Sequence, residues 1–152
     1  MHNPEPMRPG HSLTRFLGAV GVCAAIGSSL LLSSCGSADD QRPAQWSYIY
    51  PAIIEPSCAT ASCHSDFTRR AGVNFGFSDE AYFQLTQRHF VVQCAVPPAT
   101  PDPACLARAV EDSEVMHLMR AEGASRMPPD FALPDVDIRL IGAWIANNAP
   151  QN

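Results

Sequence analysis

The sequence contains no lysine, and charged residues of either sign are sparse. Its ten basic residues are all arginine and face 15 acidic residues, which gives the 152-residue chain a formal net charge of −5. A protein that binds nucleic acid needs a basic face, because clustered cations must neutralise the phosphates. The composition therefore argues against nucleic acid as a partner.

The sequence also lacks the motifs of common hydrolases and phosphate-binding proteins. It has no Gly-x-Ser-x-Gly, no His-Glu-x-x-His and no glycine-rich phosphate loop. Two carboxylate pairs have simpler roles: Asp39 and Asp40 suit a polar linker, and Asp135 and Asp137 suit the positive end of a helix. The sequence therefore offers no hydrolytic constellation.

An apolar stretch follows two arginines near the start of the chain. Arg8 and Arg15 precede residues 16–32, and the sequence Leu-Ser-Ser-Cys then ends at Cys35. A positive start, a short apolar core and small residues are typical of a secretory signal. Because Leu-Ser-Ser-Cys resembles the bacterial lipobox, we predict a lipoprotein signal peptide over residues 1–34 and lipidation of Cys35. The alternative is an uncleaved anchor helix with an incidental cysteine.

Either interpretation places the remaining chain outside the cytoplasm. Residues 35–45 are small and polar, which predicts a lipidated flexible tether, and residues 46–152 are expected to form one domain. Acyl chains on Cys35 would anchor this domain to a membrane of the cell envelope that faces the periplasm. Gly36 stands where an aspartate retains some lipoproteins at the inner membrane, which slightly favours the outer membrane.

The first half of the predicted domain contains two helix signals and one extended segment. Apolar residues recur at helical spacing from Trp46, with Pro51 expected early in the helix or at a kink. Ser78 is predicted to cap a helix over residues 79–87. An extended segment with one apolar face is indicated by the alternation of Val73, Phe75 and Phe77.

The second half contains two more helix signals. Ser113 is predicted to cap a helix that ends near Gly123, with an apolar face of Val115, Leu118 and Met119. The last helix starts at Asp135 and carries the stripe Ile138, Ile141, Trp144 and Ile145. No hairpin pair is evident, so the expected class is mostly α, with several short helices.

The sequence Cys58-Ala-Thr-Ala-Ser-Cys63-His64 is the main chemical motif of the chain. Two thiols followed directly by a histidine form the arrangement that attaches a haem covalently and places an imidazole beneath its iron. The common motif has two residues between the cysteines and this chain has four, so the spacer must bulge outwards. The alternative is a disulfide between Cys58 and Cys63, with His64 idle.

A haem iron with one histidine needs a second ligand for electron transfer, and a thioether favours its reduced state. Met127 precedes two prolines in a loop between predicted helices, and those prolines stiffen its position. Met116 and Met119 lie in a helical pattern that is typical of core residues. His89 and His117 are weaker candidates.

Cys94 and Cys105 have no place in this motif. They flank a proline-rich segment, and an exported protein seldom leaves such thiols free. We predict a disulfide between them, and a metal site is disfavoured because no histidine cluster or second cysteine pair accompanies them.

The order of these motifs over residues 46–148 resembles the class I single-haem cytochrome c domain, in particular its planctomycete-type variant. The resemblance implies a cytochrome c-like fold of short helices around a haem pocket, with one haem c bound covalently to Cys58 and Cys63. It implies His64 as the proximal ligand and Met127 as the distal ligand. It also implies that Trp144 and Ile145 pack against residues 50–54.

The function implied is the transfer of single electrons between redox protein partners, with the haem enclosed by apolar residues such as Val73, Phe75, Phe77, Leu118 and Trp144. Two alternatives stay open. One is a haem-free lipoprotein of the same fold, with Cys58–Cys63 and Cys94–Cys105 disulfides, that acts as an interaction module. The other is a haem sensor or a peroxidase-like enzyme with an open iron site.

Overall fold

Helices joined by loops make up residues 40–95 and 99–152, the part of the chain that the computed structural model describes. No strand occurs among these residues, which confirms the mostly α class. The predicted signal peptide over residues 1–34 and the predicted lipidation site at Cys35 lie outside the described residues. None of the described helices combines the length and the apolar character needed to cross a membrane.

The first helix is continuous from α1 (Trp46–Ile49) through a π-helical segment (Tyr50–Ile54) to α2 (Glu55–Cys58). Pro51 cannot donate a hydrogen bond to the carbonyl four residues earlier, and its ring crowds that turn. The wider π turn, closed by the Glu55 N–H on the Tyr50 carbonyl, accommodates it. Pro51 thus widens this helix without ending it, and the helix delivers Cys58 at its last turn.

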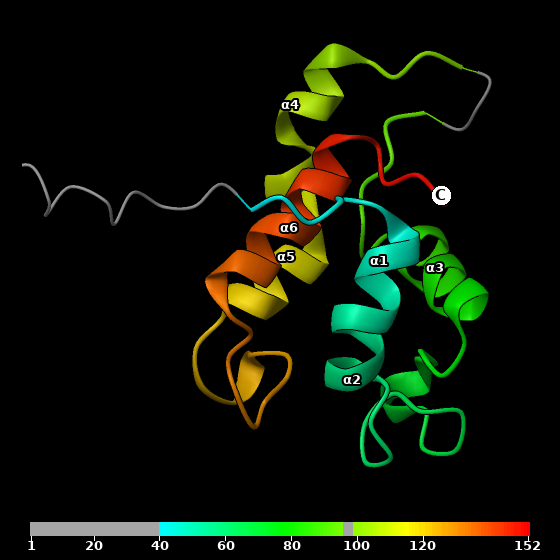
Figure 1. Cartoon of the computed structure of the whole chain (residues 1–152), viewed down its shortest axis with the longest axis vertical. Helices are drawn as coiled ribbons and strands as arrows, with labels where there is room; N and C mark the ends of the chain where they lie inside the picture. The colour runs from blue at the N-terminus through cyan, green and yellow to red at the C-terminus, as the bar shows by residue number, and fades with distance from the viewer. Residues whose placement is uncertain (1–39, 96–98) are drawn as a thin grey trace, which may run out of the picture. The chain divides into compact units, whose positions relative to one another are not determined.

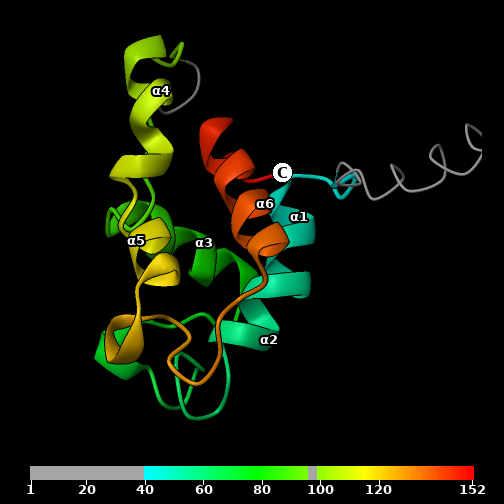
Figure 2. The same ribbon diagram turned by 90° about the vertical axis from the view of Figure 1, so that its left-hand side faces the viewer.

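Helix α6 (Asp135–Ala146) lies between the first helix on one side and α4 and α5 on the other (Figure 1; Figure 2). The predicted apolar stripe of α6 is buried, as expected. The Trp144 ring lies 5.3 Å from the ring of Trp46, one turn before the residues 50–54 where contact was expected. The Trp144 indole N–H donates to the Pro150 carbonyl, 2.9 Å away.

Helix α3 (Ser78–Gln87) begins where the sequence predicted a helix, but the predicted cap is wrong. Phe77 occupies the cap position, and Ser78 is the first helical residue. The Ser78 hydroxyl instead accepts a hydrogen bond of 3.0 Å from the indole N–H of Trp46. The Ser78 side chain, which was predicted to cap α3, therefore links α3 to α1.

Helix α4 (Pro103–Asp112) was not expected from the sequence. The Asp102 side chain accepts a hydrogen bond from the Ala104 N–H at 2.9 Å, and Pro103 occupies the first helical position. Both are standard signals of a helix start. They were not recognised because the proline-rich segment before them was interpreted as a loop. Helix α4 packs against α5 and α6.

Helix α5 (Glu114–Arg120) follows Ser113, which stands at the cap position without capping the helix. The fully buried Ser113 hydroxyl donates to the Ala109 carbonyl at 2.6 Å and accepts from the Val92 N–H at 2.9 Å. It joins the end of α4 to the segment that follows α3. Helix α5 ends at Arg120, earlier than the expected Gly123.

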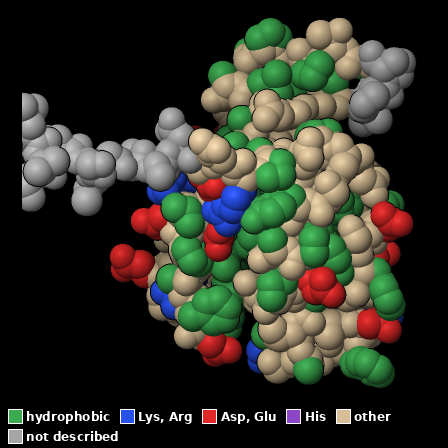
Figure 3. Space-filling view, viewed as in Figure 1, with side chains coloured by type: hydrophobic (Ala, Val, Ile, Leu, Met, Phe, Trp, Pro, Cys, Tyr) green, Lys and Arg blue, Asp and Glu red, His purple; other side chains and the backbone are tan. Residues whose placement is uncertain are grey.

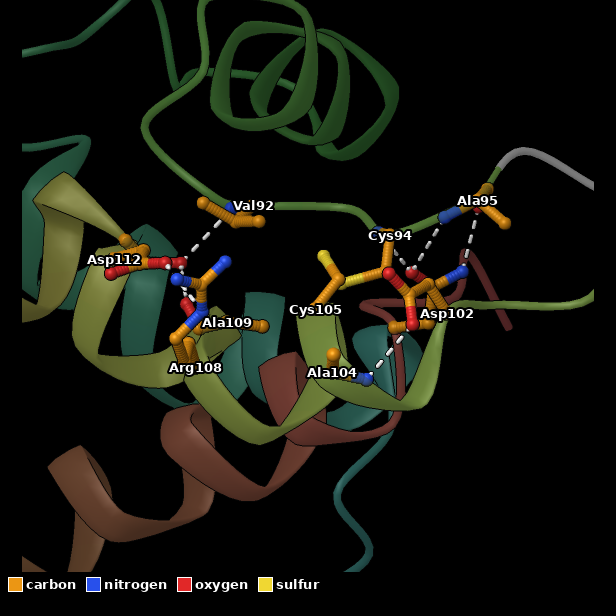
Figure 4. The surroundings of a disulfide bond; sticks show 11 residues. Val92, Cys94, Ala95, Asp102, Ala104, Cys105, Arg108, Ala109 and Asp112 are labelled. Carbon is orange, nitrogen blue, oxygen red and sulfur yellow. Dashed lines mark hydrogen bonds and ion pairs between the residues drawn. A yellow bond between two sulfur atoms is a disulfide. The ribbon is translucent and has the colours of Figure 1, made fainter.

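The predicted disulfide between Cys94 and Cys105 is present and links the segment after α3 to the first turn of α4 (Figure 4). The two Cα atoms are 5.6 Å apart. Asn148 holds the same segment from the other side, because its amide oxygen accepts from the Cys94 N–H at 2.6 Å and its amide nitrogen donates to the Ala95 carbonyl at 2.7 Å. The path of this proline-rich segment is thus fixed at its start.

The last residues of the predicted tether contact the domain. The Arg42 guanidinium bonds to Asp137 of α6 and to Asp40, each at 2.6 Å. The described unit accordingly starts at Asp40, before the first helix.

On the face drawn in Figure 3, acidic and basic side chains are interspersed with apolar and neutral ones.

Replacing Ser113 by alanine should destabilise the domain. The substitution removes both hydrogen bonds of the buried Ser113 hydroxyl and leaves the partly buried Val92 N–H without an acceptor, so we expect the free energy of unfolding to fall by about 1–3 kcal/mol. Urea denaturation followed by circular dichroism measures this change. The control is Ser125→Ala, at an exposed position, which should stay within about 0.5 kcal/mol of the parent chain. Equal stabilities of the two variants would contradict the role assigned to Ser113.

Candidate functional site

A largely apolar cavity of about 430 Å³ opens among the last turn of the first helix, α5 and the loops beside them. This volume lies within the usual range of small-molecule sites. The four residues singled out by the sequence all line it: Cys58, Cys63, His64 and Met127. Residues more than 60 positions apart in the chain, proposed on chemical grounds alone, thus share one cavity.

The four residues between the cysteines form a turn that closes on itself. The Cys63 N–H donates to the Thr60 carbonyl at 2.9 Å, as in a β-turn. The His64 N–H then donates to the Cys58 carbonyl at 3.1 Å, so the chain after the spacer returns to the end of α2. The spacer bulges as predicted, and its extra length does not separate Cys58 from His64.

The His64 ring has a defined proton arrangement. Its Nδ1 lies 3.0 Å from the Arg70 carbonyl oxygen, which can only accept, so Nδ1 carries the hydrogen. In the neutral form of the ring, this hydrogen bond leaves the lone pair on Nε2. The ring packs against Phe75 with 5.2 Å between centroids. Metal-binding histidines are commonly oriented by this kind of hydrogen bond to a backbone carbonyl. His64 is thus prepared to donate Nε2 to a metal.

The Arg70 carbonyl is held in place by an unusual turn over residues 69–72. Arg69, Ala71 and Gly72 all have left-handed backbone angles, with φ of 44°, 55° and 71°. For residues other than glycine this conformation costs about 1–2 kcal/mol each. The Arg70 N–H bonds to the Cys63 carbonyl at 3.0 Å, which ties the turn to the cysteine loop. Strained backbone thus supports the orientation of His64.

The two thiols of the motif are free and have different environments. Burial, followed by the nearby Cys63, raises the pKa of the Cys58 thiol to about 12. Hydrogen bonds from Thr60 and Ser62 lower the pKa of Cys63, and the positive charge of Arg70 adds to this effect. The Cys58–Cys63 disulfide of the alternative interpretation is not formed.

Two thioethers line the cavity, one from a loop and one from a helix. Met127 follows α5 and is 38% exposed, and its N–H donates to the Leu118 carbonyl at 2.9 Å. Met119 of α5 is buried and also lines the cavity, together with Val115 and Leu118 of the predicted apolar face. The sequence pattern thus identified this face, and Leu118 is the residue of the face that was expected to enclose a haem.

The remaining candidate ligands lie elsewhere. Met116 is fully buried and approaches Gly142 of α6, as expected for a core residue. His89 and His117 are exposed, and neither lines the cavity. Among the described residues, no three His, Cys, Asp or Glu side chains are grouped so that they could hold a metal ion. The metal donors that line the cavity are therefore an imidazole, two thiols and two thioethers.

Of the residues expected to enclose a haem, Val73, Phe75 and Leu118 line the cavity, and Phe77 and Trp144 do not. Phe77 is 61% exposed, and Trp144 belongs to the core. The alternation stops because the chain turns at Gly76, where a Cβ atom would come within 2.9 Å of the Asp66 backbone nitrogen. Walls that the sequence did not indicate are Ile54, Leu85 and Phe90.

Comparisons with protein-family models, with curated proteins and with solved structures find no match to this chain.

The two free thiols should react at very different rates in the unmodified chain. At pH 8 a pKa of about 12 leaves about one Cys58 thiol in 10,000 as the reactive thiolate. We expect iodoacetamide to modify Cys63 at least about 100-fold faster, because its thiol is partly exposed and its pKa is lowered, whereas the pKa of Cys58 is raised. Mass spectrometry of the single-thiol variants Cys58→Ser and Cys63→Ser measures both rates. Similar rates would show that the two environments do not differ as described.

Proposed function

We propose that this chain is an exported, lipid-anchored, mono-haem c-type cytochrome domain that passes single electrons between protein partners. The observation that carries the proposal is the convergence of Cys58, Cys63, His64 and Met127 on one apolar cavity. A covalent haem requires two thiols, an imidazole with a free nitrogen, and a second axial donor. The chemistry of this donor set fits such a group.

In this proposal each residue has a distinct role toward one haem c. Cys58 and Cys63 form the thioether bonds to the two vinyl groups. His64 and Met127 would bind the iron, and the bound haem would supply reversible one-electron chemistry. No bond of a substrate is made or broken, so the protein is not an enzyme.

The cavity supports this role through orientation and exclusion of water. The bond between His64 Nδ1 and the Arg70 carbonyl holds the imidazole in the tautomer whose Nε2 can bind iron. Apolar side chains such as Val73, Phe75 and Leu118 keep water away from a bound macrocycle, which disfavours the more highly charged oxidised iron. Thioether ligation by Met127 acts in the same direction, so we propose a carrier with a raised reduction potential.

The proposed location follows from the predicted signal peptide over residues 1–34. Lipid on Cys35 would hold the domain at a membrane that faces the periplasm, with the outer membrane slightly favoured. There it would exchange electrons with redox proteins. The haem-free interaction module receives less support, because Cys58 and Cys63 are not joined by a disulfide and line the same cavity as His64 and Met127.

Covalent haem attachment tests the proposal directly. Produced in a bacterial host with the cytochrome c maturation system, the exported chain should give a band that retains haem stain after denaturing electrophoresis. Cys58→Ser or Cys63→Ser should reduce staining by at least about tenfold, because one thioether site is lost. The double variant Cys94→Ser/Cys105→Ser is the control and should still stain wherever it accumulates. A lipidated, exported and colourless parent protein would sink the proposal.

The distal ligand is tested by a matched pair of methionine variants. In the oxidised protein, the methionine–iron charge-transfer absorption band should disappear in Met127→Ala. It should persist in Met119→Leu, which removes the other cavity thioether and keeps similar volume. Loss of the band only in Met119→Leu would make Met119 the ligand. Absence of the band in the parent protein would favour the sensor or peroxidase-like alternative.

A further inference from the structure

Among the described residues that line the cavity, Arg70 alone has a permanent charge. The other lining side chains are apolar, apart from Ser57, the two thiols and His64. Because Arg70 is itself exposed, it lies where the cavity meets solvent. The cavity therefore combines an apolar interior with one cation at its mouth. This combination suits an occupant that is apolar over most of its surface and acidic at one edge.

The Arg70 guanidinium has no hydrogen-bond or ion-pair partner within residues 40–95 and 99–152. Three arginines in neighbouring segments do bond to acceptors in the chain: Arg69 to Asp66, Arg88 to Gln84, and Arg126 to the carbonyl of Pro128. A guanidinium presents five donors in a planar fork that matches a carboxylate. Arg70 thus retains its full donor capacity at the edge of the cavity.

The base of the Arg70 side chain is fixed by its own backbone. Its N–H bonds to Cys63 and its carbonyl oxygen to His64, both at 3.0 Å. Hydrogen bonds with Thr60 and Ser62 are the main cause of the lowered pKa of Cys63, and the charges of Asp130 and Arg70 act on it in opposite directions. One residue therefore combines a backbone group that orients His64 with a charged side chain that lines the cavity.

We propose that Arg70 binds the propionate carboxylates of the haem at the cavity mouth, an assignment that rests on the proposed function. Arginine and carboxylate form short, charge-assisted hydrogen bonds, often two in parallel. A macrocycle whose apolar body lies in the cavity leaves its two acidic groups near solvent, where Arg70 stands. Neutralising their negative charge makes addition of an electron to the iron more favourable.

The test uses the haem-loaded full chain and four proteins: the parent, Arg70→Gln, Arg70→Lys and Arg108→Gln. Arg108 is exposed on α4 and does not line the cavity, so Arg108→Gln repeats the loss of charge away from the haem. The first readout is the propionate bending band in the resonance Raman spectrum, which reports contacts of the carboxylates. The second is the reduction potential from a spectroelectrochemical titration.

We expect Arg70→Gln to shift the propionate band. We also expect it to lower the equilibrium constant for reduction of the iron at least threefold, which is a fall in reduction potential of about 28 mV at 59 mV per tenfold change. Arg70→Lys should shift the band, because the planar fork is lost, while it retains a potential near that of the parent. Arg108→Gln should change neither readout. If Arg70→Gln yields little folded protein, the band of Arg70→Lys still decides whether the fork contacts a carboxylate.

The outcomes separate this inference from the proposed function. Full haem content in all four proteins, with a band unchanged by either Arg70 substitution, would overturn the role of Arg70 and leave the cytochrome proposal standing. A parent protein that carries no haem would defeat both. Equal potential shifts in Arg70→Gln and Arg108→Gln would reduce Arg70 to a remote charge and also overturn the inference.

Discussion

Trp46 is the residue that joins the first helix to α3 and α6. Its indole is buried, packs against Trp144 of α6 and Tyr82 of α3, and donates a hydrogen bond to Ser78. Its backbone N–H bonds to the Asn152 side chain at 3.0 Å, which includes the end of the chain in the same contact. Because Cys58 ends the helix that Trp46 begins, these contacts also fix where the first cysteine enters the cavity.

Backbone hydrogen bonds shape the part of the cavity that contains the cysteines and His64. Bonds from His64 to the Cys58 carbonyl and from Arg70 to the Cys63 carbonyl fold one short stretch into two linked turns. The second turn includes left-handed residues, and its strain is offset by these bonds at about 1 kcal/mol each. The result is an imidazole whose orientation is set by main-chain atoms, which no neighbouring side-chain substitution removes directly.

Helix positions and site chemistry were predictable to different extents. The stripe of α6 and the face of α5 follow from spacing alone, and the site residues follow from the chemistry of thiol, imidazole and thioether. The roles of Ser78 and Ser113 were not predictable, because each hydroxyl bonds to a group that only the tertiary structure brings near. The position of Phe77 outside the cavity was not predictable for a similar reason: the chain turns at Gly76, where the Asp66 backbone leaves no room for a Cβ atom.

The turn between the cysteines has a consequence for how such sites are defined. The hydrogen bond from the His64 N–H to the Cys58 carbonyl closes the loop at its two ends. Loops of different lengths could be closed by the same hydrogen bond. The number of residues between the two cysteines could then change while the geometry of Cys58 and His64 is retained. In this view, the positions of Cys58, Cys63 and His64 define the motif, and the number of residues between the cysteines can vary.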